Sequence, residues 1–155
     1  MKKQIHITLM QSVGFYDEGD NSMEKTLVLI KPDGVERNLI GEILCFYERK
    51  GLKITSLKMV KADRETAEDH YIEHKGRSYF EGLINFITSG PLCALVVEGE
   101  NAVQAVRQIN GSTEPLQAAM GSIRGTYALS MGRNMVHGSD SVEHAEREIK
   151  VWFKE

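Results

Sequence analysis

The amino-acid sequence predicts an α/β fold of the α+β kind, a ferredoxin-like split β-α-β sandwich in which helices cover a four-stranded antiparallel sheet. Residues 24–30 and 92–97 are rich in apolar residues and suit strands that are buried on both faces of a sheet. Elsewhere, apolar residues recur at intervals of three and four, as they do in helices that pack on a sheet. The predicted order of elements is β-α-β-α-α-β-α-loop-β-α, which is the split pattern with one helical insertion.

The predicted domain covers residues 23–155, and residues 1–22 differ from it. Residues 5–9 alternate only weakly between apolar and polar side chains, and residues 16–22 are acidic and rich in turn-forming residues. We therefore expect residues 1–22 to be a flexible N-terminal extension or a tag.

The first half of the domain begins with the strand over residues 24–30, and residues 31–34 (Lys-Pro-Asp-Gly) predict a turn after it. Apolar residues spaced by three and four predict a helix over residues 40–47 that ends before Gly51, a residue suited to the position after a helix. Residues 52–59 alternate with one slip of phase, which predicts a bulged strand.

The middle of the domain alternates helices with one strand. Asp63 is a candidate N-cap for a helix that runs to about His74, and residues 80–87 predict another helix. The apolar strand over residues 92–97 follows, and residues 103–107 lie on the next predicted helix.

The last part of the domain is predicted as a loop, a strand and a helix. Residues 111–124 form a loop with several glycines, and residues 127–131 alternate as a fourth strand would. Asp140 or Ser141 caps the final helix. The apolar stripe of that helix consists of Val142, Ala145, Ile149 and Trp152.

Composition and charge exclude several classes of protein. The 155 residues carry 19 Lys and Arg against 22 Asp and Glu, a net charge of −3, which gives no sign of a surface for nucleic acid or anionic membranes. No stretch approaches the length of a membrane span. Cys45 and Cys93 lie far apart and form neither a disulfide framework nor a zinc motif, so we expect a cytoplasmic protein in a reducing compartment.

The unusual segment is residues 132–141, in which His137 is followed by glycine and by serine and aspartate side chains that can cap a helix. A histidine near the N-terminus of a helix lies beside free backbone N–H groups, which suits a phosphoryl group. Glu148 lies on the same predicted helix, and its carboxylate could hold one imidazole nitrogen while the other attacks. The glycine-rich phosphate loops of P-loop and dinucleotide-binding proteins are absent, so phosphates would have to be bound by separate cationic side chains.

Residues 134–141 (Asn-Met-Val-His-Gly-Ser-Asp-Ser) resemble the active-site signature of nucleoside diphosphate kinases, N-x-x-H-G-S-D-S. The resemblance extends in order from about Glu24 to Trp152. It passes through residues 30–34, His70-Tyr71, residues 77–83, Ser89-Gly90-Pro91, residues 107–115 and Ile123-Arg124-Gly125.

This resemblance implies that His137 accepts the γ-phosphoryl group of a nucleoside triphosphate, typically ATP, and passes it to a nucleoside diphosphate in a ping-pong reaction. It also implies roles for other residues. The phosphates would be bound by Lys31, Arg107, Arg124 and Thr113. Asn134 would bond the sugar hydroxyl, and Tyr79 and Leu83 would hold any of the bases. Ser139 and Glu148 would orient His137, and Tyr71 would reach the surroundings of His137.

The resemblance further implies Mg²⁺ carried by the nucleotide phosphates, without a metal cage in the protein. His70 and His74 are spaced as metal ligands on a helix could be, but a third ligand at suitable spacing is missing. The implied assembly is a homo-oligomer, a hexamer rather than a tetramer. Two alternatives stay open: a ferredoxin-like module that binds nucleic acid, and a phosphotransferase that passes the group from His137 to a partner protein.

Overall fold

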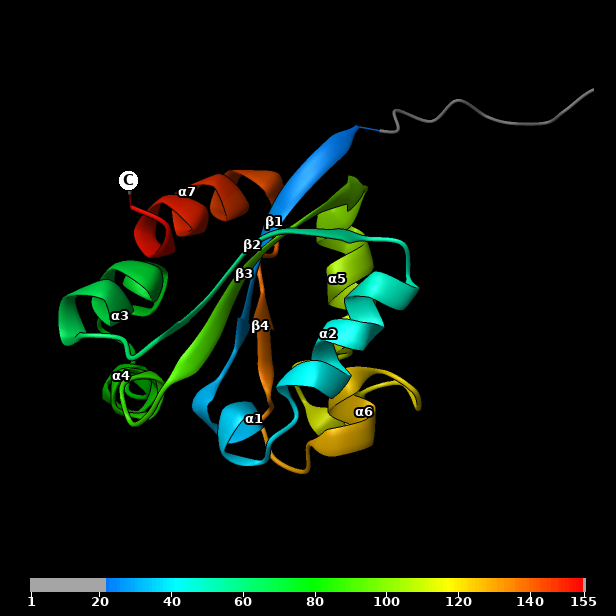
Figure 1. Ribbon diagram of the computed structural model, residues 1–155. Helices are drawn as coiled ribbons and strands as arrows, with labels where there is room; N and C mark the ends of the chain where they lie inside the picture. The colour runs from blue at the N-terminus through cyan, green and yellow to red at the C-terminus, as the bar shows by residue number, and fades with distance from the viewer. Residues whose placement is uncertain (1–21, 155) are drawn as a thin grey trace, which may run out of the picture.

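The computed structural model describes residues 22–154, and Figure 1 shows a twisted sheet with helices on both faces. The strands are β1 (Met23–Ile30), β2 (Lys53–Val60), β3 (Leu92–Glu100) and β4 (Val136–Gly138). They form one four-stranded sheet in the order β2-β3-β1-β4, and every neighbouring pair is antiparallel. The predicted fold class is therefore confirmed, whereas the predicted extension lies outside the described residues apart from Ser22.

The helices cover the two faces of the sheet in separate groups (Figure 1). On one face lie α3 (Arg64–His70), the 3₁₀ turn η1 (Ile72–His74), α4 (Phe80–Ile87) and α7 (Val142–Trp152). On the other lie α1 (Pro32–Glu36), α2 (Ile40–Arg49), α5 (Ala102–Asn110), the 3₁₀ turn η2 (Pro115–Gln117) and α6 (Ile123–Tyr127).

The central strand β1 is buried on both faces because its side chains alternate between two hydrophobic clusters. Val28 and Ile30 pack with the helices of the α2 and α5 face, whereas Leu27 and Leu29 pack with those of the α4 and α7 face. This explains why the strand reads as a continuous apolar run. The edge strand β2 alternates between exposed and half-buried residues, and its register shifts between Ile54 and Ser56, where the sequence predicts a bulge.

The predicted strand over residues 127–131 is wrong. Ser122 accepts a hydrogen bond from the backbone N–H of Gly125 and caps α6, so the chain is helical up to Tyr127. Leu129 is 83% exposed and Met131 57% exposed, so their alternation does not mark a buried face. The fourth strand is β4, and it contains His137 itself.

Other elements are shorter or more helical than the sequence suggests. The predicted turn at residues 31–34 is the beginning of α1, and the predicted helix from Asp63 to His74 breaks at Tyr71 into α3 and η1. The predicted loop over residues 111–124 contains η2 and the first turn of α6. In α7, Ser141 is the N-cap, but Val142 is exposed rather than part of the apolar stripe.

No helix within residues 22–154 is long and apolar enough to cross a membrane.

Candidate active site

His137 lies on β4, where it pairs with Leu29 of the central strand. The neighbouring Gly138 allows β4 to pack closely on α5, because a Cβ atom at this position would lie 2.8 Å from Nδ2 of Asn110 and 2.9 Å from Cγ1 of Val106. A larger residue would push the strand away from the helix. The backbone that carries His137 is thus fixed on both sides.

A chain of hydrogen bonds holds the imidazole of His137. Its Nε2 lies 2.8 Å from Oε2 of Glu148, and the hydroxyl of Ser139 donates to the same oxygen at 2.7 Å. Ser139 is in turn fixed to β1, because the backbone N–H of Leu27 donates to its Oγ at 3.3 Å. The predicted contact between imidazole and carboxylate is therefore present.

This arrangement decides which nitrogen of His137 can react. An ionised carboxylate only accepts hydrogen bonds, so Nε2 of His137 carries the hydrogen in the neutral ring and Nδ1 carries the lone pair. Burial raises the pKa of Glu148, but the hydrogen bond and the charge of His137, with the bond from Ser139, lower it to about 2. Glu148 is thus ionised at any pH near neutral. The side chain of His137 is 23% exposed, so the site is open to a reactant.

Lys31 and Asn134 form a second buried part of the site, at the end of β1. The ammonium of Lys31 donates to Oδ1 of Asn134, and Nδ2 of Asn134 donates to the carbonyl of Thr113 at 3.0 Å. Met135 next to Asn134 has a φ of 68°, and its N–H donates to Oδ2 of Asp33 at 3.0 Å, which holds this uncommon backbone conformation.

The charge of Lys31 is costly to bury. Burial lowers the pKa of Lys31 to about 8; the carboxylate of Asp33 opposes this shift and the charge of Arg124 adds to it. An anion bound beside Lys31 would reverse the shift by favouring the ammonium form.

Arg124 is buried and ties three segments of backbone together. Its Nε donates to the carbonyl of Asn134 at 3.2 Å, Nη1 to that of Gly111 at 2.8 Å and Nη2 to that of Val136 at 2.7 Å. These bonds use three of the five N–H groups of the guanidinium, and the others remain for a ligand. Arg124 therefore holds in place the backbone that leads to His137, and it adds a positive charge to the site.

Arg107 on α5 and Thr113 after it are exposed at the rim of the site. Arg107 is close enough to Arg124 for its charge to lower the pKa of Arg124, after the larger effect of burial and against the opposing effect of Tyr47. No carboxylate within residues 22–154 forms an ion pair with Lys31, Arg107 or Arg124. Grouped cations without such partners are suited to bind a polyanion.

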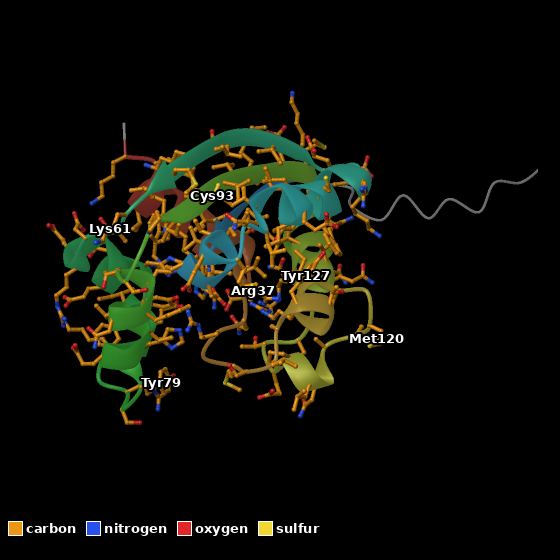
Figure 2. All side chains as sticks on the ribbon, turned by 60° about the horizontal axis from the view of Figure 1, so that its bottom comes forward. Arg37, Lys61, Tyr79, Cys93, Met120 and Tyr127 are labelled. Carbon is orange, nitrogen blue, oxygen red and sulfur yellow. The ribbon has the colours of Figure 1, made fainter. Side chains whose placement is uncertain are left out.

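The predicted aromatic residues lie on the face of α3 and α4. Tyr71 is half-buried against His70, with 4.6 Å between the ring centroids, and burial, together with the charge of Glu148, raises the pKa of its hydroxyl. Tyr79 is 52% exposed at the outer end of α4, as Figure 2 shows, and Leu83 lies one helical turn after it. Tyr79 offers an open ring face and Leu83 an apolar side, which suits stacking of a flat ring.

The structure also brings His70 to the site, which the sequence analysis did not expect. One nitrogen of His70, one of His137 and one carboxylate oxygen of Glu148 lie within 4.8 Å of one another, as ligands of a metal ion would. However, Nδ1 of His70 faces the indole N–H of Trp152 at 3.2 Å and must accept from it, which places the hydrogen on Nε2. The donor set does not fit a metal, because neither nitrogen of His70 then has a free lone pair.

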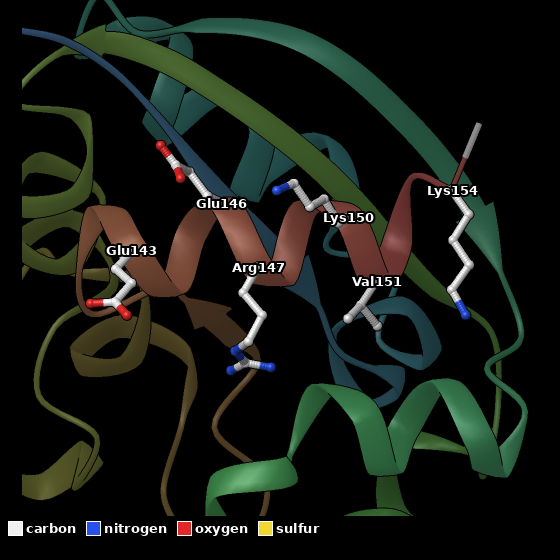
Figure 3. Close-up of a pocket in the computed structure, with 6 residues that line it drawn as sticks. All are labelled: Glu143, Glu146, Arg147, Lys150, Val151 and Lys154. Atoms are coloured by element: carbon white, nitrogen blue, oxygen red, sulfur yellow. The ribbon is translucent and has the colours of Figure 1, made fainter.

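His137 is not among the residues that line two hollows on the surface. One of about 420 Å³ is lined by Asn101, Gln104, Ala105, Arg107 and Gln108 of α5. The other, of about 400 Å³, runs along α7, where Figure 3 shows Arg147 pointing toward the α3 side. It is lined by Glu143, Glu146, Arg147, Lys150, Val151 and Lys154. The site around His137 is thus identified by its side chains rather than by the depth of a hollow.

Comparisons with known proteins agree with this chemistry. The sequence profile of the family described as "Nucleoside diphosphate kinase" matches residues 24–155. A nucleoside diphosphate kinase of Sulfurisphaera tokodaii is 58% identical over 134 residues, which cover 86% of this chain and 91% of the relative. The solved nucleoside diphosphate kinase of Encephalitozoon cuniculi superimposes with a TM-score of 0.83 at 41% identity and covers 85% of this chain and 90% of its own. The nucleoside diphosphate kinase of Halobacterium salinarum, solved in complex with CDP, superimposes with a TM-score of 0.83 at 46% identity and covers 86% of this chain and 90% of its own. The chain therefore belongs to the nucleoside diphosphate kinase family and is an enzyme that transfers phosphoryl groups between nucleotides.

Proposed function

We propose that the enzyme works in two half-reactions through a phosphohistidine at Nδ1 of His137. In the first, the Nδ1 lone pair attacks the γ-phosphorus of a nucleoside triphosphate, the bond from that phosphorus to the bridging oxygen breaks, and the diphosphate leaves with the electron pair. In the second, a terminal oxygen of another diphosphate attacks the phosphorus, the bond from phosphorus to Nδ1 breaks, and the electron pair returns to the imidazole. The observation that carries the proposal is the bond from Nε2 of His137 to Glu148, which leaves Nδ1 as the free nucleophile.

Glu148 and Ser139 act on the ring rather than on the phosphate. As phosphorus bonds to Nδ1, positive charge develops on the imidazole, and the ionised carboxylate of Glu148 stabilises it through Nε2. Ser139 keeps the carboxylate in place.

The cationic side chains are proposed to bind the phosphates. Lys31, Arg107 and Arg124 would neutralise oxygens of the transferring group, and Thr113 would add its hydroxyl. Asn134 is proposed to bond the sugar hydroxyl with the hydrogen of Nδ2 that Thr113 leaves free, while it holds Lys31.

A divalent cation is consistent with the family, and we propose Mg²⁺. Mg²⁺ prefers oxygen ligands and keeps several waters. The carboxylates whose charges interact with the cationic cluster are engaged or enclosed: Asp33, beside Lys31, is buried and accepts from the N–H of Met135, and Asp140, whose pKa is raised by burial but lowered overall by His144 and Arg107, bonds His144. The residues therefore fit a Mg²⁺ that is held by phosphate oxygens. Such an ion would draw negative charge away from the phosphate oxygens during transfer.

Tyr79 and Leu83 are proposed to hold the base by stacking, and Tyr71 to line the approach to His137. Stacking on an exposed ring distinguishes little between bases, so we expect broad acceptance of nucleotides. The relative from Halobacterium salinarum was solved with CDP, and this supports a nucleoside diphosphate as the acceptor.

Steady-state kinetics test the proposal. With ATP varied at several fixed concentrations of dTDP, we expect parallel lines in double-reciprocal plots, as a ping-pong reaction gives. Intersecting lines would show direct transfer in a ternary complex. A phosphoenzyme that transfers its group to a partner protein but not to any diphosphate would favour the protein-phosphotransferase alternative.

Removing the charge of Glu148 should slow the reaction. We expect Glu148→Gln to lower kcat about 10²-fold, because the amide no longer balances the charge on the imidazole. Stopped-flow measurement of His137 phosphorylation checks this, with Glu146→Gln on the exposed side of α7 as the matched control. A Glu148→Gln enzyme within about 3-fold of the wild type in kcat would contradict the role of Glu148.

Lys31 should set an alkaline limit on nucleotide capture. Since the pKa of Lys31 is lowered to about 8, the free enzyme loses this charge as pH rises through that value, and kcat/KM should fall there. The Lys31→Arg enzyme stays charged, so its profile should remain flat between pH 7 and about 10. The same alkaline fall in both enzymes would assign the titration to another group.

We propose a homo-hexamer in the cytoplasm. Both cysteines are free, as in a reducing compartment. Apolar side chains are exposed on two separate surfaces, Leu57 and Met59 on the edge strand β2, and Leu116 and Met120 near α6, with Met120 at the rim in Figure 2. We propose that each surface pairs with its own copy on another chain, which would let dimers assemble into a closed ring.

Light scattering tests the assembly. We expect a particle of six times 17.4 kDa, and Leu57→Lys on β2 should reduce it to smaller species. A particle of four chains would show that the enzyme is a tetramer and not a hexamer. A monomer would contradict any homo-oligomer.

A further inference from the structure

His70 is a buried histidine whose hydrogen-bonding pattern is fixed by a tryptophan. It ends α3, is 3% exposed, and its Nδ1 lies 3.2 Å from Nε1 of Trp152 on α7. The indole N–H can only donate, so Nδ1 must keep its lone pair. The neutral ring of His70 therefore carries its hydrogen on Nε2.

That Nε2–H has no hydrogen-bond partner within the described residues, and it is shielded from solvent. Buried donors without partners are uncommon in proteins and call for a physical explanation. A phenylalanine in place of His70 would fill the space without leaving an orphan N–H, although it would free the indole N–H of Trp152. The histidine is thus not explained by packing alone.

The explanation lies in what His70 contacts. Its ring meets that of His137 edge to face, with 4.5 Å between centroids and 81° between planes. Tyr71 flanks it at 4.6 Å, and Trp152 at 5.6 Å. Glu148 holds one nitrogen of His137, and His70 blocks rotation of the ring plane about that hydrogen bond.

We propose that His70 is a positioning residue for His137, and that Trp152 locks it in the Nε2–H form so that it stays neutral beside the nucleophile. The proposal rests on His137 being the nucleophile. A locked ring keeps the Nδ1 lone pair of His137 in one direction, as in-line attack on phosphorus requires. A neutral His70 also does not compete with His137, or with Arg147 at 3.6 Å, for the charge of Glu148.

The surroundings of His70 act in the same direction as the lock, with one exception. Burial holds the pKa of His70 well below its usual range, and His137, Arg147 and His74 act in the same direction. Glu148 opposes them and would draw a proton onto His70. Donation from Trp152 occupies the Nδ1 lone pair that this proton would need.

Long-range ¹H–¹⁵N NMR of histidine-labelled protein tests the lock without any substrate. We expect His70 to give the pattern of a neutral ring with hydrogen on Nε2 from pH 5 to 8. In the Trp152→Phe protein, we expect a mixture of tautomers or a protonated ring toward pH 5. Ile87→Val, in the same hydrophobic cluster, is the control for loosened packing and should leave the pattern unchanged. Hydrogen on Nδ1 of His70 in the wild type would overturn the lock.

Single-turnover kinetics test the positioning role. His70→Ala removes the ring that packs against His137, and we expect it to slow phosphorylation of His137 about 10-fold to 100-fold while nucleotide Kd changes less than about 2-fold. His70→Phe keeps a flat, neutral ring and should recover part of the rate. Trp152→Phe should lose rate as pH falls toward 5 more steeply than the wild type.

The two sets of outcomes are distinguishable. An unchanged phosphorylation rate in folded His70→Ala would overturn the positioning role. Absence of any phosphohistidine in the wild type would instead remove the proposed function, while the NMR result on the tautomer would still stand on its own.

Discussion

Replacing His137 by glutamine is expected to reduce phosphoryl transfer at least about 10⁴-fold, because glutamine has no lone pair that can form the phosphoenzyme. The amide can still donate to Glu148 at the position of Nε2, so the buried carboxylate keeps a partner. The fold should therefore survive, and circular dichroism and melting temperature check that it does. The transfer rate from ATP to dTDP measures the effect.

His144→Gln is the matched control for this substitution. His144 lies on α7, and its ring bonds Asp140 and Glu73 rather than the carboxylate of Glu148. We expect its rate to stay within about 3-fold of the wild type. A His137→Gln enzyme that keeps a comparable rate would show that phosphate passes directly between nucleotides.

Arg124→Met is expected to damage both stability and activity. The methionine leaves the carbonyls of Gly111, Asn134 and Val136 without the donors that Arg124 gives them, and at about 1 kcal/mol for each the loss is about 3 kcal/mol. Loss of a cation at the phosphates should lower kcat/KM about 10³-fold. Urea denaturation and steady-state kinetics measure the two effects.

Two further variants separate these effects. Arg124→Lys keeps the positive charge but loses the planar set of N–H donors of the guanidinium, so it should recover part of kcat/KM and little of the stability. Arg133→Met removes an exposed ion pair with Glu36 and should change stability little. If Arg124→Met is as stable as Arg133→Met, the three carbonyl contacts do not stabilise the fold.

The central sheet could be predicted because burial on both faces leaves a strong pattern in sequence. β1 and β3 are apolar along most of their length, since successive side chains enter opposite hydrophobic clusters. The bulge in β2 could also be predicted, because a slip in alternation has few other causes.

The fourth strand could not be predicted in the same way. Tyr127, Leu129 and Met131 alternate, but the pattern does not tell an exposed apolar side chain from a buried one, and Leu129 and Met131 are exposed. β4 is three residues long, which is too short for a period to appear. Its pairing with β1 depends on tertiary contacts of Gly138 with α5.

The contact of Glu148 with His137 could be predicted from its place on the helix that follows, and the role of Ser139 was implied by the family resemblance, whereas neither indicated His70. Glu148 follows His137 by 11 residues and Ser139 lies between them, so the local path of the chain from β4 into α7 brings the three side chains together. His70 reaches His137 only because α3 packs against α7, and Trp152 fixes it from the far end of α7. The signal available in sequence was the adjacent pair His70-Tyr71 within the resemblance, which gives no direction to either ring.

The most direct test of the mechanism is isolation of the phosphoenzyme. Enzyme incubated with γ-³²P-ATP and Mg²⁺ and freed of nucleotide should carry acid-labile label on the peptide that contains His137, up to one group per chain. Addition of any nucleoside diphosphate should discharge the label as the matching triphosphate. Label on another residue, or label on His137 that diphosphates do not remove, would contradict transfer through this histidine.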